Sequence, residues 1–295
     1  MADYILSCSS TADMCEQWFE DRDVKYLCFH FFLADEEFPD DLGKSMPYKK
    51  FYNSMVEGAM TKTSQPNADE YKNYFESFLK EGKDVIHLTL SSGISGAFNS
   101  AKIAQSMCEE EYPDRKIYVI DSLAASGGFG LLIDMMADLR DNGMNIDDLA
   151  KWAEENKKKL NHWFFTSDLT YLIRGGRVSK TSGFIGNMLN ICPLLNVDFE
   201  GKLIARAKIR TKKKVIQATA DKIIELAENG KDYDGKIFIN HADCYEDAKA
   251  VADILEANLP KLNGKVLINY IGTTIGAHTG PGTVACFFYG AERVD

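Results

Sequence analysis

The chain of 295 residues contains 34 lysine and arginine residues against 44 aspartate and glutamate residues, which gives a formal net charge of −10. This balance excludes the general positive field with which proteins attract nucleic acid or an anionic membrane, so either partner would need a local basic patch. A hydrophobic content of 45% with 26% charged residues excludes a disordered chain, and the length is sufficient for about two globular domains.

Short β-type runs alternate with helical patterns along almost the whole chain. The predicted strands lie at residues 4–7, 24–32, 85–90, 117–120, 163–166, 203–207, 236–240, 266–270 and 284–289. The predicted helices lie at about 46–59, 67–81, 95–111, 128–141, 146–160, 212–228 and 243–258. This alternation is typical of βαβ units and predicts an α/β fold of two α/β domains with mostly parallel sheets. We expect the domains to span residues 1–160 and 161–295.

Local signals bear on one helix start and on the cellular compartment. Asn67, followed three residues later by Glu70, predicts a capping box at the start of helix 67–81.

The seven cysteines include no C-x-x-C pair, which predicts free thiols in a reducing compartment rather than disulfides or a zinc site. The first residues resemble no signal peptide, and no apolar run approaches the ~18 residues of a membrane-spanning helix. We therefore expect a cytoplasmic protein with no metal centre, no cofactor and no membrane span.

The small polar residues at 91–96 follow one predicted strand and open the next predicted helix. Ligands of open α/β sheets bind beyond the carboxyl ends of the strands, where this segment falls. The backbone N–H groups of Gly96 and Ala97, with the Ser95 hydroxyl, have the donors that bind an anion at a helix N-terminus. The same residues also fit a plain helix start with Ser95 as N-cap.

A glycine-rich loop before the last predicted strand contains one of five histidines. His278 and Thr279 can both donate hydrogen bonds, and Gly280 and Gly282 allow the backbone to approach a ligand closely. The alternative is a histidine that is structural or simply exposed.

Several enzyme motifs are absent from the sequence. The nearest approach to G-x-S-x-G, at 93–97, ends in Ala97, and the segment 280–283 lacks the lysine of a nucleotide-binding P-loop. An alternative function is a hydrolase or transferase acting on a small acid, with Ser95 as nucleophile and His278 as base. That function requires the two side chains within hydrogen-bond reach, which a sequence does not show.

Four segments in this order resemble the DegV family over nearly the whole chain. They are Thr-Ser-Gln-Pro at 63–66, Ser-Ser-x-x-Ser-Gly at 91–96, Arg-Gly-Gly-Arg-Val-Ser at 174–179 and His-Thr-Gly-Pro-Gly-Thr at 278–283. The resemblance implies a protein that binds a long-chain fatty acid, such as palmitate or oleate, in the crevice between two α/β domains. It implies a carrier rather than an enzyme. Some members present the acid to a separate fatty acid kinase, which phosphorylates the carboxylate.

The resemblance also implies which residues bind the ligand. Thr63 and Ser95 would hydrogen-bond the carboxylate, His278 would lie beside it, and Arg177 would lie near the head group. The full implied set is Thr63, Ser64, Ser95, Gly96, Arg177, His278 and Thr279. Two segments depart from the family pattern, because 9–11 reads Ser-Ser-Thr instead of Asp-Ser-Thr and 192–193 reads Cys-Pro instead of Lys-Pro.

Two further groups of residues have candidate roles. The apolar stripe of Phe184, Ile185, Met188, Leu189 and Ile191 could line part of a tunnel for the acyl tail, although such a stripe is more often plain core. A local basic patch stands out on this acidic chain, because its lysines fill the first turn of a helix, where they oppose the helix dipole. The patch predicts a docking surface for an acidic partner such as a kinase domain. The alternative is a patch that is simply solvated. The patch residues are Arg206, Arg210, Lys212 and Lys213.

Overall fold

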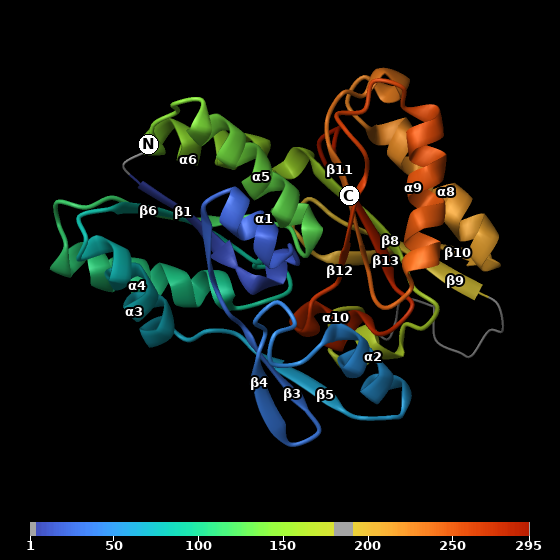
Figure 1. The fold of residues 1–295 in the computed structure, drawn as a ribbon, viewed down its shortest axis with the longest axis horizontal. Coiled ribbons are helices and arrows are strands. Elements are labelled where there is room, and N and C mark those ends of the chain that lie inside the picture. Colours follow the sequence, from blue (N-terminus) through green and yellow to red (C-terminus); the bar gives the residue numbers. More distant parts are fainter. Residues whose placement is uncertain (1–3, 180–190, 295) are drawn as a thin grey trace.

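The computed structural model describes residues 4–179 and 191–294, which form three β-sheets with helices packed around them (Figure 1). The first sheet has four parallel strands in the order β2-β1-β6-β7. These are β1 (Tyr4–Ser9), β2 (Val24–Leu27), β6 (Asp84–Thr89) and β7 (Ile117–Asp121). The strand order reverses between β1 and β6, so a crevice opens where these two strands end.

Helices cover both faces of this parallel sheet. On one face lie α3 (Ala68–Leu79) and α4 (Ala97–Glu111), and on the other lie α5 (Gly127–Asp141) and α6 (Ile146–Asn156), with the short α1 (Glu16–Asp21) beside β2. Alternate residues of β6 therefore enter different cores: Val85 packs toward α3 and α4, while Ile86 packs toward α5. Coverage of both faces explains why every residue of β6 from Val85 to Thr89 is buried.

The second sheet has six strands in the order β10-β9-β8-β13-β11-β12. Its strands are β8 (Leu160–Phe165), β9 (Ile191–Val197), β10 (Leu203–Arg210), β11 (Ile237–His241), β12 (Leu267–Tyr270) and β13 (Val284–Tyr289). One face packs against α5, and the other against α8 (Lys212–Leu226) and α9 (Tyr245–Asn258). Because α5 also covers the first sheet, it lies between the two sheets (Figure 1).

The prediction of mostly parallel sheets holds for the first sheet and is wrong for the second. Within the six-stranded sheet only β11 and β12 run parallel, and every other neighbouring pair is antiparallel. The physical reason is that β9 and β10 form a hairpin, which needs only a short turn, whereas a parallel pair needs a long crossover. The α/β class itself is confirmed.

A small third sheet was not predicted. It is antiparallel, in the order β4-β3-β5, and consists of β3 (His30–Leu33), β4 (Glu36–Pro39) and β5 (Thr61–Ser64). Next to it lie α2 (Tyr48–Val56) and α10 (Thr273–Thr279), at the bottom of Figure 1. The single strand predicted at 24–32 is therefore two strands, because the chain leaves the first sheet after Leu27 and enters the third at His30.

The seven predicted helices are confirmed, with ends that differ by a few residues. The capping box is also confirmed, because Asn67 Oδ1 accepts from the Glu70 N–H at 3.0 Å and Glu70 Oε2 accepts from the Asn67 N–H at 2.8 Å. The short elements α1, α7 (Thr170–Arg174) and α10, and the 3₁₀ turns at Ser10–Ala12, Lys157–Lys159 and Gly230–Asp232, were not predicted. Elements of three to seven residues contain too few turns for a hydrophobic period to be read.

Over residues 4–179 and 191–294, no helix combines the length and the apolar character that crossing a membrane requires.

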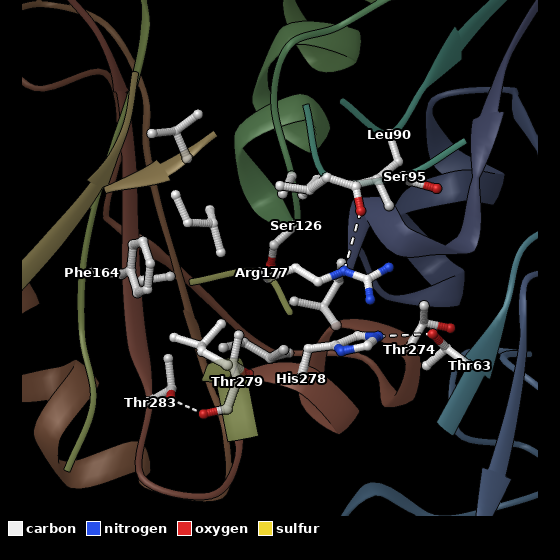
Figure 2. A pocket seen from close by; sticks show the side chains of 18 of the residues that line it. Thr63, Leu90, Ser95, Ser126, Phe164, Arg177, Thr274, His278, Thr279 and Thr283 are labelled. Carbon is white, nitrogen blue, oxygen red and sulfur yellow. Dashed lines mark hydrogen bonds between the residues drawn. The ribbon is translucent and has the colours of Figure 1, made fainter. Parts of the chain in front are cut away.

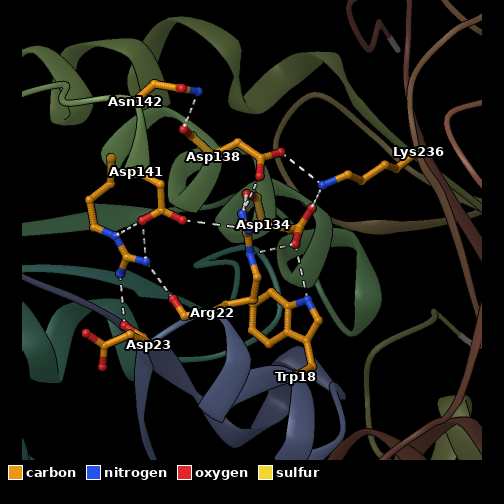
Figure 3. A network of polar contacts seen from close by, with 9 residues as sticks. Trp18, Arg22, Asp23, Asp134, Asp138, Asp141, Asn142 and Lys236 are labelled. Atoms are coloured by element: carbon orange, nitrogen blue, oxygen red, sulfur yellow. Dashed lines mark hydrogen bonds and ion pairs between the residues drawn. The ribbon is translucent and has the colours of Figure 1, made fainter.

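An ion-pair network on α5 joins the two larger sheets (Figure 3). Lys236, just before β11, contacts Asp134 at 2.5 Å and Asp138 at 2.9 Å, while Arg22, just after α1, contacts the same two carboxylates at 3.2 and 2.5 Å. The Trp18 indole N–H also donates to Asp134, at 3.2 Å. These contacts fix α5 against the parallel sheet and the six-stranded sheet, and segments of both form walls of the cavity described next.

The domain division at residue 160 remains a prediction, and β8 begins at that residue.

Candidate functional site

A cavity of about 310 Å³ lies between the three sheets (Figure 2). Most of the exposed wall surface is apolar, and the wall comes from the six-stranded sheet, from β5, from the loops that follow β6 and β7, and from α7 and α10. The lining residues are Phe29, Thr63, Ser64, Gln65, Leu90, Ile94, Ser95, Ala125, Ser126, His162, Phe164, Leu172, Arg177, Val197, Leu203, Ile271, Thr274, Ile275, His278, Thr279, Thr283, Ala285 and Phe287. In Figure 2 the labelled Thr63, Ser95, Arg177 and His278 lie on one side of the cavity, and Phe164 lies on the other.

Thr63 and His278 form a hydrogen-bonded pair on the polar side of the cavity. Thr63 lies in β5, a strand of the third sheet, and its Oγ1 lies 2.8 Å from His278 Nε2. His278 stands in the last turn of α10, so its predicted place in a glycine-rich loop is wrong. Burial, with a smaller effect from the nearby Arg177 charge, lowers the pKa of His278 to about 4. The imidazole is therefore neutral at pH 7 and can act as a hydrogen-bond partner without adding a positive charge.

Ser95 lies at the carboxyl end of β6, in the turn that opens α4. Its hydroxyl donates to Gln65 Oε1 at 3.1 Å and accepts from the Ala97 N–H at 3.2 Å. The prediction of Ser95 as the N-cap is off by one residue, because Gly96 is the N-cap of α4, although the Ser95 hydroxyl still accepts from the first helical N–H; Ser95 also lines the cavity. A hydroxyl that donates to an amide oxygen can donate instead to the oxygen of an incoming carboxylate.

Arg177 connects two loops at the polar side. Its Nε donates to the Ile94 carbonyl at 3.2 Å and its Nη1 donates to the Gly175 carbonyl at 2.6 Å. Burial lowers the pKa of Arg177 from its ordinary value, yet a guanidinium remains charged at neutral pH. Arg177 thus holds the turn that carries Ser95 and places a positive charge close to the Thr63–His278 pair.

Six of the seven residues implied as ligand-binding line this one cavity. Gly96 does not, because it is exposed and the Gln65 amide lies over it, at 3.0 Å from where a β-carbon would stand. Ser64 and Thr279 lie in the wall, and the Thr279 carbonyl accepts from the Thr283 hydroxyl at 3.0 Å. The roles of all seven in binding remain predictions.

Sequence reasoning missed several polar residues of the wall, among them Gln65, Ser126 and His162. Gln65 lies inside the segment Thr-Ser-Gln-Pro at 63–66, and that place was its available signal. Ser126 and His162 had no such signal, because His162 reads as one residue of a buried strand. Burial lowers the pKa of His162 well below its ordinary value, so this side chain is neutral.

The residues expected along the acyl tail lie partly outside the described chain. Phe184, Ile185, Met188 and Leu189 fall in the undescribed segment, and Ile191 begins β9 without lining the cavity. The apolar wall is made by other residues, such as Leu90, Phe164 and Phe287.

The geometry bears on the alternative of a serine nucleophile. His278 Nε2 contacts Thr63, whereas the Ser95 hydroxyl is directed at Gln65. Activation of a serine requires a base in hydrogen-bond contact with its hydroxyl, and among the described residues this contact is with an amide instead.

The predicted docking residues follow β10, which is an edge strand of the six-stranded sheet, into the first turn of α8. Arg206 and Arg210 are exposed on β10, and Arg206 donates to Asn196 Oδ1 at 2.8 Å. Lys212 forms an ion pair with Asp247 at 2.8 Å, so its charge is already balanced, while Lys213 is exposed. Basic residues on an edge strand also protect it from pairing with another chain.

Comparisons with known proteins agree with this architecture. A family model described as "uncharacterised protein, DegV family" matches residues 8–291. A DegV domain-containing protein of Clostridium perfringens is 37% identical over 293 residues, which cover 99% of each chain. Among solved structures, a DegV lipid-binding protein of Thermotoga maritima has 30% identity and a TM-score of 0.82, over 99% of this chain and 100% of that one. A second Thermotoga maritima protein, described as revealing a fatty acid binding function, has 29% identity and a TM-score of 0.81 with the same coverage. The chain therefore belongs to the DegV family.

Proposed function

We propose that this protein binds one long-chain fatty acid, such as palmitate or oleate, with its carboxylate at Thr63 and Ser95 and His278 beside it. The observation that carries the proposal is the cavity itself, whose wall exposes mainly apolar side chains and gathers two hydroxyls, the neutral His278 imidazole and Arg177 on one side. Two relatives of known structure are described as binding lipid or fatty acid, at 30% and 29% identity. An amphipathic anion matches such a wall better than a small polar acid does.

The energetics support a long acyl chain. A fatty acid of palmitate length buries ~14 methylene groups at ~0.8 kcal/mol each, which is about 11 kcal/mol before other costs. Ordering and association cost several kcal/mol, and the hydrogen bonds of the carboxylate offset part of that cost, so binding stays favourable. The polar side then fixes the direction of the chain, because it combines hydroxyl donors with the Arg177 charge, whereas the hydroxyls of Ser126 and Thr283 elsewhere in the wall already donate to protein oxygens.

Lipid extraction and mass spectrometry test the ligand. Freshly purified protein, extracted under denaturing conditions and compared with native mass spectrometry of the intact chain, is expected to carry close to one fatty acid per chain. The double variant Thr63→Val with Ser95→Ala is expected to lose about tenfold to a hundredfold in affinity for palmitate, because two donors of ~1 kcal/mol or more are removed. Ser106→Ala, which removes an α4 hydroxyl that does not line the cavity, is the matched control. No fatty acid in the extract and no uptake of added palmitate or oleate would contradict the proposal.

We also propose that the bound acid is presented to a separate fatty acid kinase. The sequence lacks a P-loop for nucleotide phosphates, so the phosphoryl transfer is assigned to the partner. The exposed Arg206, Arg210 and Lys213 supply positive charge for docking on an acidic surface. Lys212 is excluded from this role because Asp247 already balances its charge.

Charge reversal tests the docking surface. Arg210→Glu with Lys213→Glu is expected to lower the rate of acyl-phosphate formation by a purified fatty acid kinase about tenfold at low salt, since rim charges act mainly on association. Palmitate affinity is expected to stay at the wild-type value, because neither residue lines the cavity. An unchanged rate would mean that these residues only protect the edge strand.

A further inference from the structure

Two carboxylates are buried where the three sheets meet. Asp13 follows the 3₁₀ turn after β1 and is 3% exposed, and Asp40 follows β4 and is 1% exposed. A β-carbon placed on Gly272 would stand 2.5 Å from Asp13 Oδ1 and 3.5 Å from Asp40 Oδ1. The two oxygens are therefore at most about 6 Å apart, the sum of these distances. Two charges at such a distance inside a protein repel each other strongly.

Hydroxyl groups surround this pair, and no cation balances it within residues 4–179 and 191–294. Asp13 Oδ2 accepts from the Ser126 hydroxyl at 2.5 Å, and Asp13 Oδ1 has no partner among those residues. Asp40 accepts from Ser10 Oγ at 3.2 Å and from Thr273 Oγ1 at 2.7 Å. No lysine, arginine or histidine of the described chain forms an ion pair with either carboxylate.

The other titratable groups that face the pair are acids as well. The phenols of Tyr48 and Tyr52 come from α2, and the Cys28 thiol lies near Asp40. Around these three groups lie Cys15, Asp41, Cys244 and one cation, Lys44, which is half exposed and already forms an ion pair with Glu16. Burial raises the pKa of both Asp13 and Asp40, and the Asp40 charge raises that of Asp13 further.

We infer that Asp13 keeps a proton at neutral pH, so that the pair carries a single negative charge, and that in this state the pair positions the cavity wall. The contacts that carry the second half of the inference are direct. Asp13 holds Ser126, which lines the cavity at the start of α5, and Asp40 holds Thr273, which begins the helix that carries His278. This positioning role rests on the proposed function, whereas the inference that Asp13 is protonated does not.

The sign of the pH dependence follows from linkage. In the unfolded chain Asp13 ionises near pH 4, whereas in the folded chain it stays protonated to higher pH. Its contribution to stability is therefore complete below about pH 4 and is lost as the pH rises from there through the folded-state pKa. Asp13→Asn keeps the shape of the side chain and removes the ionisation, so it removes this part of the pH dependence.

Unfolding in urea at pH 5 and at pH 8 tests the proton. The folding equilibrium constant of Asp13→Asn, divided by that of the wild type, is expected to increase at least tenfold from pH 5 to pH 8. The reason is that a proton retained only by the folded wild type lowers the wild-type constant by up to tenfold per pH unit. Asp134→Asn is the matched control, since Asp134 is also 3% exposed but is paired with Arg22 and Lys236, and this variant is expected to be less stable than wild type at pH 8. A ratio equal at the two pH values would overturn the inference, and a cation bound between the carboxylates would give that result.

Two further measurements complete the test. If Asp13→Asn does not fold, the infrared band of a protonated carboxyl group in the wild type at pH 7, shifted in Asp40→Asn, reports the same proton. Its absence from the wild type overturns the inference. Palmitate affinity of the wild type is expected to fall at least threefold from pH 7 to pH 9, while that of Asp13→Asn stays constant. An equal change of affinity with pH in both proteins would overturn the positioning role. A protein that binds no fatty acid at either pH would refute the proposed function instead, and the unfolding comparison would still decide the proton.

Discussion

Arg293→Met is expected to lower the free energy of unfolding by about 3–5 kcal/mol, measured by urea or thermal unfolding. Arg293 is 5% exposed, and its guanidinium donates only to backbone carbonyls. Nη1 donates to Leu123 at 2.8 Å and to Asp198 at 2.9 Å, and the remaining donors reach the carbonyls of Lys157 and Lys158 at 3.3 and 3.4 Å. Methionine retains the aliphatic volume but removes two short charge-assisted hydrogen bonds, to Leu123 and Asp198, each worth about 1.5–3 kcal/mol. The Leu123 carbonyl loses its donor, whereas the other three carbonyls keep a backbone N–H.

The expected loss is large because Arg293 is buried and joins segments that belong to different sheets. Leu123 belongs to the loop after β7, whereas Asp198 follows β9, so one side chain links the parallel sheet to the six-stranded sheet. Close by, the Ser91 hydroxyl donates to the Gly201 carbonyl at 2.9 Å, which links the Ser95 turn to the β9–β10 hairpin. Losing Arg293 should therefore loosen the cavity wall as well as lower stability.

A second arginine provides the control for Arg293. Arg115 also donates to a backbone carbonyl, that of Gly82, at 2.5 Å, but its side chain is 35% exposed. Water can replace that donor, so Arg115→Met should change the free energy of unfolding by only about 0.5 kcal/mol. Equal effects of the two substitutions would mean that the buried position of Arg293 does not matter.

The parts of the fold that sequence could predict are those with strong local patterns. The run at 284–289 is apolar because helices cover both faces of its sheet, with Phe287 and Phe288 in different cores. In the run at 85–90, Val85 and Ile86 likewise enter different cores. The Asn67 capping box is local in the same way, because both partners lie within one turn. The place of Ser95 followed from a general rule about where parallel strands end.

The remaining features depend on contacts between residues far apart in the chain. Thr63 and His278 are separated by 215 positions, and the hydrogen bond between them requires the third sheet to pack beside α10. No local pattern distinguishes a parallel from an antiparallel neighbour in the six-stranded sheet, since both present buried apolar runs. The proximity of Asp13 to Asp40 likewise depends on how three separate sheets meet, so two ordinary acidic residues gave no signal in the sequence.

Gly175→Ala is expected to weaken palmitate binding about tenfold while the protein remains folded. Gly175 has φ of −71°, which alanine adopts freely, so the backbone is unaffected. The added methyl group, however, would stand 2.3 Å from His278 Nδ1, and the imidazole must move away from Thr63. The loss of one hydrogen-bonding position at the carboxylate, about 1.4 kcal/mol, corresponds to a tenfold change in Kd. Isothermal titration with palmitate measures this change.

The neighbouring glycine gives the opposite pattern, and this contrast makes the test specific. Gly176 has φ of +72° and nothing within 4 Å of its β-carbon position, so Gly176→Ala should cost about 1 kcal/mol of stability and leave His278 in place. Palmitate affinity is then expected to fall in Gly175→Ala alone, whereas thermal stability is expected to fall more in Gly176→Ala. If both substitutions weaken binding equally, the position of His278 does not control the ligand, and the carboxylate must depend on Thr63, Ser95 and Arg177 without it.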